Sequence, residues 1–159
     1  MNKRLLKKKI IARLTGELET YLRAAQASRA EATHEQSRAE NKYDTRGLEA
    51  SYLAKGQSRQ VAELQASIGT FEKMEIKNFA EGQGIDVGAV VEVEHRGEKT
   101  TYFIATKAGG TEVVYDRNEV LVITPQSPLG EQLMGKKTGD LLKLALNGAP
   151  DPYHVVSVI

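Results

Sequence analysis

The sequence predicts an α+β protein, in which an antiparallel α-helical coiled-coil hairpin precedes a small antiparallel sheet domain with one short helix. Three observations predict this fold class. The first 77 residues contain no proline and only four of the fourteen glycines, and their apolar residues recur at intervals of three and four. These apolar residues become smaller towards the middle of the segment and larger again after it, so their sizes follow the same order from either end. From Ala80 onward, short β-branched runs alternate with glycine and proline.

Apolar side chains in the first part shrink towards the middle of the segment and grow again after it. Pairing them from the middle outwards gives nearly constant position sums, as expected for two antiparallel helices that face each other. The pairs are Ala32 with Ala50, Ala25 with Ala54, Leu18 with Val61, Leu14 with Leu64, and Ile11 with Ile68. We therefore expect a hairpin over residues 1–77 that narrows to a tip near residues 37–44. A thin, projecting tip suggests a probe that enters a partner.

The second part has the pattern of a sheet domain over residues 85–159, joined by a linker at residues 78–84 that contains two glycines. The expected strands cover residues 87–94, 100–106, 111–115, 119–124, 141–146 and 153–159. Gly109-Gly110 predicts a hairpin leading into the third of these strands. Ser127, followed by Pro128, predicts the start of a short helix that ends at Gly135.

Composition limits the function classes. The chain has no cysteine, which excludes a disulfide framework and a thiolate nucleophile and fits a reducing cytoplasm. No run approaches the roughly 18 apolar residues of a membrane span. We expect a soluble, cytoplasmic monomer. Net charge is +1, but basic residues exceed acidic ones through Lys77 and the reverse holds afterwards, which suggests a partner with a mixed surface.

Candidate catalytic residues are scarce. His34, His95 and His154 lie far apart without ligand spacing, and no nucleotide-binding or nucleophile motif is present. We therefore assign no active site of its own to the chain. The basic opening, residues 3–9, suits either nucleic-acid contact or a solvated helix start. We favour the second, because no aromatic residues interleave with these charges.

The expected tip carries the acids of most chemical interest. These acids, interspersed with basic residues, are Glu31, Glu35, Glu40 and Asp44. Spacings of four or five place them on roughly one helix face. In one interpretation these acids are solvated and pair with the neighbouring basic residues of the tip. In the other, one or two of their carboxylates are delivered to a metal ion in a partner. Magnesium suits the second interpretation, because it takes one or two protein carboxylates and keeps several waters.

Residues 123–140 read Ile-Thr-Pro-Gln-Ser-Pro-Leu-Gly-Glu-Gln-Leu-Met-Gly-Lys-Lys-Thr-Gly-Asp. This Ser-Pro, Gly-Lys and Gly-Asp string closely resembles the C-terminal signature of the bacterial Gre transcript-cleavage factors. The resemblance implies an FKBP-like C-terminal domain that docks at the rim of the RNA polymerase secondary channel. It further implies that the hairpin enters this channel and that two tip acids help to hold the catalytic magnesium. The polymerase then cleaves its own backtracked RNA, and the factor is a stimulator rather than an enzyme.

The resemblance transfers to this chain residue by residue. The expected partner-binding residues are Ser127, Pro128, Leu129, Gly130, Gln132 and Leu133. At the tip, Glu40-Asn41 matches the end of the family motif, whereas Ser37 takes the place of its first acid. A second register places Asp44 at the first acid and aligns Tyr52 with the family tyrosine. Glu40 is the expected contributor to the polymerase magnesium, with Asp44 beside it, and no tightly bound cofactor is expected.

Several functional hypotheses follow. The leading one is an elongation factor that binds RNA polymerase and stimulates cleavage of backtracked RNA. Its association with RNA and DNA would be indirect, through the elongation complex. An alternative keeps the docking without cleavage, so that the protein modulates or inhibits transcription. A third, from another class, is a prolyl isomerase or chaperone, although the aromatic residues of the second half are sparse for a proline pocket. A structural coiled-coil oligomer is the fourth.

Overall fold

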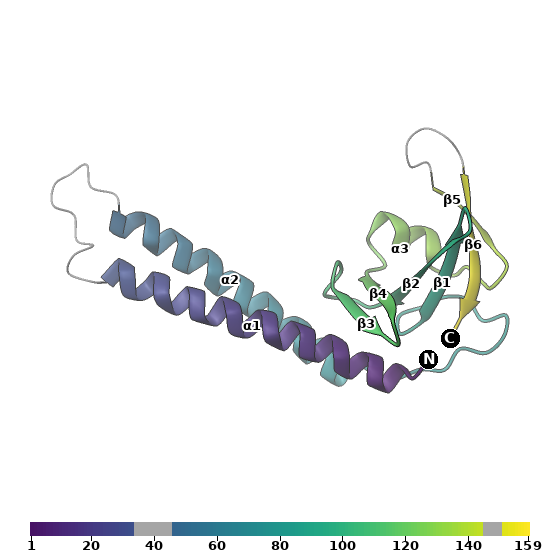
Figure 1. The fold of residues 1–159 in the computed structure, drawn as a ribbon, viewed down its shortest axis with the longest axis horizontal. Helices are drawn as coiled ribbons and strands as arrows, with labels where there is room; N and C mark the ends of the chain where they lie inside the picture. The colour runs from purple at the N-terminus through teal and green to yellow at the C-terminus, as the bar shows by residue number, and fades with distance from the viewer. Residues whose placement is uncertain (34–45, 145–150) are drawn as a thin grey trace. The chain divides into compact units, whose positions relative to one another are not determined.

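A computed structural model describes residues 1–33, 46–144 and 151–159 (Figure 1). Two long helices, α1 (Lys3–Thr33) and α2 (Arg46–Lys73), come first and are followed by six strands and a short helix α3 (Pro128–Leu133). The residues group into two compact units. One unit combines Met1–Ile11 with Thr70–Ile159, and the other contains Ala12–Gly69.

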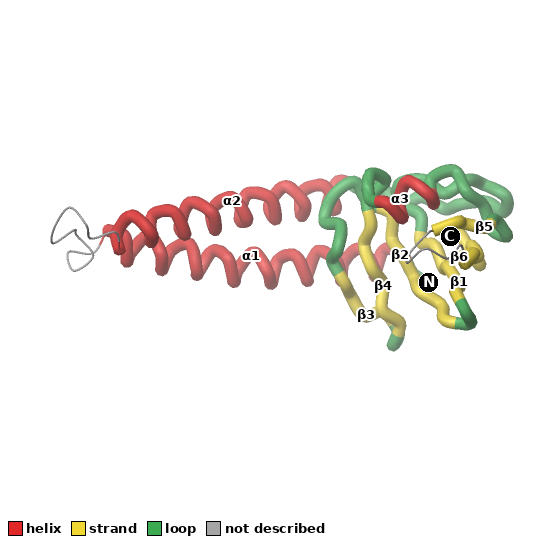
Figure 2. Tube along the Cα trace, turned by 90° about the horizontal axis from the view of Figure 1, so that it is seen from above, coloured by secondary structure: helices red, strands yellow, loops and turns green. Residues whose placement is uncertain are grey.

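The unit of residues 12–69 consists of the facing parts of α1 and α2, which lie side by side and run antiparallel (Figures 1 and 2). Leu14 and Ala25 are buried between the helices, at 1% and 4% exposure. Across the pair, the guanidinium of Arg29 donates a hydrogen bond of 2.6 Å to Ser58 Oγ. The predicted helical hairpin is thus confirmed. Its expected tip, including Glu40 and Asp44, lies outside the described residues.

The other unit is built on one six-stranded sheet, confirming the α+β class. Its strands are β1 (Val90–His95), β2 (Glu98–Ile104), β3 (Glu112–Tyr115), β4 (Asn118–Ile123), β5 (Leu141–Leu144) and β6 (Asp151–Val158). They are arranged in the order β3-β4-β2-β1-β6-β5. All neighbours pair antiparallel except β2 and β4, which run parallel with Phe103 opposite Val122. The sheet is therefore mixed, and the expectation of purely antiparallel pairing was wrong for this pair.

The hairpin predicted across Gly109-Gly110 was also wrong. Strand β4 lies between β2 and β3, and the tight hairpin connects β3 to β4 instead. Its two turn residues, Asp116 and Arg117, have φ angles of 47° and 67°. Positive φ at both central residues gives a two-residue turn the same twist as the strands that it joins. Turns of this kind usually contain a glycine, and this one does not. This turn therefore has no recognisable sequence signal, whereas the β1–β2 turn contains Gly97, whose φ angle is 83°.

Side chains alternate along each strand, so the sheet presents apolar residues on both of its faces. Helix α3 packs on one face and the ends of α1 and α2 pack on the other. On one face, Val91 and Val93 belong to a core that also contains Leu133 of α3. On the other face, Phe103 lies against Phe71 of α2, with 6.1 Å between ring centroids. This second face buries the residues Val90, Val113, Tyr115, Val120 and Val122, and the nearby helix ends bury Leu6 and Ile10. The ends of the two long helices are thus part of the sheet unit.

Two lysines of the basic opening are tied to backbone carbonyls of this unit. The Lys3 ammonium donates to Lys77 O at 2.7 Å and to Gly88 O at 3.1 Å, and its side chain is only 6% exposed. Lys7 Nζ donates to the carbonyls of Glu72 and Met74, at 2.9 and 2.8 Å, where α2 ends. The expectation of a solvated helix start was therefore wrong for these two lysines. It fits the exposed Lys8 and Lys9.

The buried position of Lys3 predicts a pH dependence of stability. Burial lowers the pKa of Lys3 from 10.5 to about 8. Between these two values the unfolded chain holds a proton that the folded chain has lost, so this group makes the free energy of unfolding rise with pH. Denaturant titrations from pH 7 to 10.5 should show the wild type gaining stability relative to Lys3→Met across this window. The exposed Lys8→Met is the control for losing a charge, and a pH-independent difference for Lys3→Met would contradict the prediction.

Candidate docking segment at helix α3

The short helix α3 is defined by the local hydrogen bonds of its first residues. Ser127 adopts an extended conformation and caps the helix: its Oγ accepts from Gly130 N at 3.1 Å and donates to Thr124 O at 2.7 Å. Pro128 occupies the first turn, where no backbone donor is needed. Gly135, with φ 75°, follows the end of the helix. The predicted short helix is confirmed.

Gly130 is required by close packing against the preceding turn. A Cβ at this position would lie 1.9 Å from the carbonyl oxygen of Thr124 and 2.8 Å from Ser127 Oγ. The residue is buried, and its own carbonyl accepts from Met134 N at 3.0 Å. No other residue type fits here without moving the backbone, so Gly130 holds α3 against the end of β4.

The second half of the sequence signature forms turns as well. Gly135 N donates to Ile85 O at 2.8 Å, and Ile85 N donates to Lys136 O at 2.7 Å, which ties the end of α3 to the segment before β1. The carboxylate of Asp140 accepts from Lys137 N at 2.8 Å. Gly139, with φ 92°, completes this turn before β5. The Gly-Lys and Gly-Asp pairs therefore serve mainly the backbone geometry.

The six predicted partner-binding residues differ in their access to solvent. Pro128 and Gln132 are exposed, and Ser127 and Leu129 are half-buried. Gly130 and Leu133 are buried, with Leu133 at 0% exposure in the core beneath the helix. These two residues can support a docking surface but cannot form it. The exposed neighbours Gln126 and Glu131, which the sequence analysis did not assign to docking, extend the same surface.

The metal and catalytic predictions remain predictions. Glu40 and Asp44 fall outside the described residues. Across the described ranges, no group of three His, Asp or Glu side chains could hold a metal ion. His95 stacks on Tyr153 with 4.0 Å between ring centroids, and His154 is exposed on the same sheet. Over those same ranges, no helix is long and apolar enough to cross a membrane.

Comparison with known proteins identifies the second half of the chain. A sequence model of the C-terminal domain of the transcription elongation factors GreA and GreB matches residues 80–159, which include the whole of α3. No curated protein matches the chain.

Similar solved structures include two Gfh1 proteins. The one from Thermus thermophilus is 25% identical, with 94% of each chain covered and a TM-score of 0.37. The one from Thermus aquaticus is 23% identical over 95% of this chain and 94% of its own, with a TM-score of 0.38. A GreA/GreB factor from Nitrosomonas europaea is 14% identical over 70% of this chain and 91% of its own, with a TM-score of 0.37.

The packing around α3 predicts a graded series of stability losses. Gly130→Ala forces the Thr124 carbonyl to move, and overpacking of this kind costs about 1–3 kcal/mol. Ser127→Ala removes the helix cap and costs about 1 kcal/mol. Gln132→Ala, at an exposed position, should change the free energy of unfolding by less than about 0.5 kcal/mol. Urea titrations followed by near-UV circular dichroism measure all three, and a Gly130→Ala variant as stable as Gln132→Ala would refute this interpretation of the signature.

Proposed function

Because the chain belongs to the GreA/GreB family of transcription elongation factors, we propose that it docks on RNA polymerase through the α3 segment and directs its hairpin tip to the catalytic magnesium of the polymerase. Factors of this family bind RNA polymerase. The single observation that carries the proposal is the family match over residues 80–159. The proposed docking site is the rim of the secondary channel.

The geometry of α3 supports a docking role for its outer surface. The cap at Ser127 and the close packing at Gly130 fix the helix backbone on the sheet, so the positions from which its exposed side chains project are set before a partner arrives. The available side chains are Gln126, Pro128, Glu131 and Gln132, with part of Leu129. They offer hydrogen-bonding groups around a small apolar centre, a composition suited to a protein interface.

The proposed role of the tip is electrostatic. Glu40 would contribute one carboxylate oxygen to the magnesium that belongs to the polymerase, with Asp44 nearby in sequence. Carboxylate oxygens are suitable magnesium ligands, and one or two from a protein are sufficient. The metal promotes hydrolysis of the RNA phosphodiester by polarising the phosphate and activating a water. The factor would thus complete the active site of the polymerase without being an enzyme itself.

Ser37 favours a second candidate function. It occupies the place of the first acid of the family motif, so the register that keeps Glu40-Asn41 provides only one acid. A factor with one acid would occupy the channel and slow transcription without RNA cleavage. The prolyl isomerase alternative gains no support from the family match.

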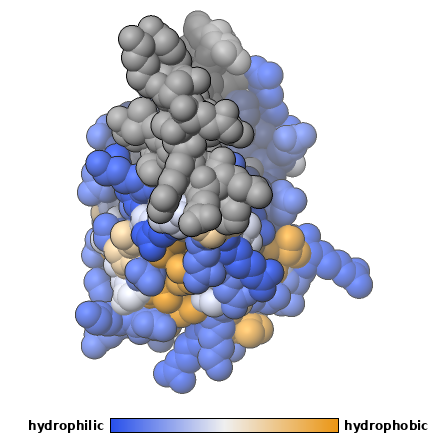
Figure 3. All heavy atoms as spheres, turned by 90° about the vertical axis from the view of Figure 1, so that its left-hand side faces the viewer, coloured by the Kyte–Doolittle hydropathy of each residue, from blue (hydrophilic) through white to orange (hydrophobic). Residues whose placement is uncertain are grey.

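The oligomer alternative needs an apolar outer surface on the helices. Within the described part of the helical unit, only Tyr21 and Leu22 are large apolar side chains that are exposed, at 38% and 37%. Figure 3 shows one face of the molecule on which hydrophilic side chains predominate and apolar ones form small groups. The small exposed apolar surface of the described helices favours the expected monomer.

Polymerase binding and RNA cleavage test the proposal together. The protein should co-purify with core RNA polymerase at moderate salt, and Gln132→Lys should weaken this binding about tenfold, whereas Gln65→Lys on the exposed surface of α2 should not.

In backtracked elongation complexes with magnesium, the wild type should shorten the RNA faster than polymerase alone. Glu40→Gln should lose this effect, and Glu19→Gln, at an exposed position of α1 outside the tip acids, should keep it.

The possible outcomes separate the candidates. Slower RNA synthesis without shortening would favour the channel-blocking function over cleavage. Failure of the wild-type protein to bind core polymerase would reject both.

A further inference from the structure

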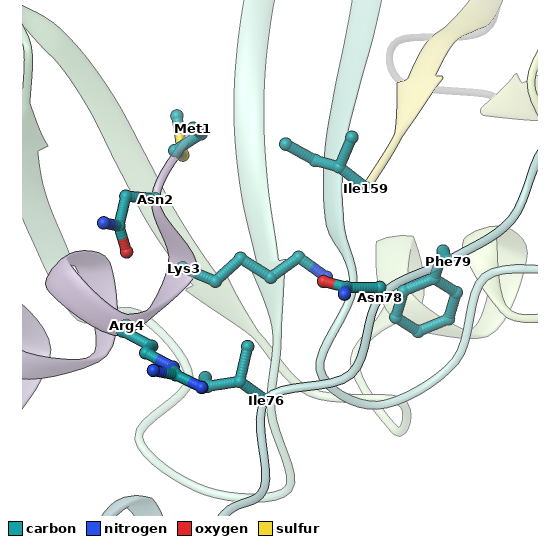
Figure 4. A pocket seen from close by; sticks show the side chains of 8 residues that line it. All are labelled: Met1, Asn2, Lys3, Arg4, Ile76, Asn78, Phe79 and Ile159. Atoms are coloured by element: carbon teal, nitrogen blue, oxygen red, sulfur yellow. The ribbon is translucent and has the colours of Figure 1, made fainter.

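A pocket with a volume of about 440 Å³ lies in the sheet unit, away from the signature residues of α3 (Figure 4). It is formed by the start of α1, the segment after α2 and the last residue of the chain. The lining residues are Met1, Asn2, Lys3, Arg4, Ile76, Asn78, Phe79 and Ile159. All eight belong to the same compact unit. The volume is in the range of pockets that hold small molecules.

The side chains that line this pocket are positively charged or neutral. Lys3 and Arg4 are basic, Asn2 and Asn78 carry amides, and no aspartate or glutamate is among the lining residues. The Asn2 side-chain oxygen accepts from Leu5 N at 3.1 Å and caps α1, so the positive end of the helix dipole is also directed here. Counted over its side chains, the pocket therefore has an excess of positive charge.

The environment of Lys3 leaves this charge without an anionic partner. Its ammonium contacts two carbonyl oxygens, and it lies 4.7 Å from the centroid of the Phe79 ring. These partners are polar or aromatic, but none carries a negative charge, and burial lowers the pKa of Lys3 to about 8. An ammonium has three N–H donors, and the carbonyls of Lys77 and Gly88 use two of them. One donor remains for a further acceptor.

The other wall of the pocket is apolar. Figure 4 shows Lys3 extending towards Asn78 and Phe79, with Arg4 next to Ile76. The apolar lining consists of Met1, Ile76, Phe79 and Ile159. Phe79 and Ile76 are half-buried, so part of each side chain is available to a ligand. Small-molecule sites commonly combine apolar walls with a few polar groups that orient the ligand.

We propose that this pocket binds a small organic anion. Its carboxylate or phosphate group would accept hydrogen bonds from Lys3 and Arg4, and its compact apolar body would pack against Ile76 and Phe79. A bound anion would supply the negative charge that the surroundings of Lys3 lack. It would also connect the start of α1 with the segment after α2 and stabilise the sheet unit by mass action. This site is separate from the α3 surface and does not depend on polymerase binding.

Three probes with one ring test the proposal: phenyl phosphate, benzoate and phenol. Their binding to the full chain is measured by amide chemical shifts in NMR at constant ionic strength. We expect saturable shifts at residues 76–79 with at least one of the two anions and none with neutral phenol. The tighter-binding anion identifies whether the site prefers phosphate or carboxylate.

Variants show whether the named residues form the site. Arg4→Ala, at an exposed position, should weaken binding of the preferred anion about tenfold, and Lys3→Met should weaken it further. Lys8→Ala removes an exposed charge from the same helix outside the pocket and should leave binding unchanged. Since Arg4→Ala leaves every buried contact in place, it decides the question even if Lys3→Met fails to fold. Equal losses in Arg4→Ala and Lys8→Ala, equal shifts with phenol, or no saturable binding of either anion would overturn the proposal.

Discussion

The sheet face opposite α3 has to be covered, and the ends of the two long helices cover it. Phe103 and its apolar neighbours on β4 and β3 would otherwise face water, and Phe71 of α2 packs on Phe103 at 6.1 Å. Leu6 and Ile10 of α1 are fully buried. Burying such side chains contributes about 1.5–3 kcal/mol each. The carbonyl contacts of Lys3 and Lys7 then fix the helix ends in place. The folding of the sheet thus depends on helical residues distant in sequence.

This constraint separates the residues that build the domain from those available to a partner. With one face closed by the long helices, α3 covers the other through Leu133 and leaves its outer side exposed. The serine, proline and glycines of the sequence signature mostly fix turns and the helix cap. Their spacing identifies the family because it specifies a backbone path, and the exposed side chains around Gln132 remain available for recognition.

The sequence predicted local features better than distant ones. Helix α3 was predictable because serine, proline and glycine act within a few residues of one another. The parallel pairing of β2 with β4 was missed because it depends on packing between distant segments, and the turn at Asp116 has no glycine signal. Lys3 was misjudged because a lysine in a basic run looks solvated until the carbonyls around it are known. For the candidate site, sequence analysis found the α3 segment but did not separate buried Leu133 from exposed Gln132. The tip acids remain sequence-based predictions.

Amide hydrogen exchange tests most directly whether the helix ends belong to the core of the sheet unit. If they do, the amides of Leu6, Ile10 and Phe71 should exchange as slowly as that of Phe103, because all four would open only when the sheet unit unfolds. Amides near Ala25, where the helices face each other through small side chains, should exchange faster. Exchange at Leu6 and Ile10 as fast as near Ala25, with Phe103 still protected, would contradict this account.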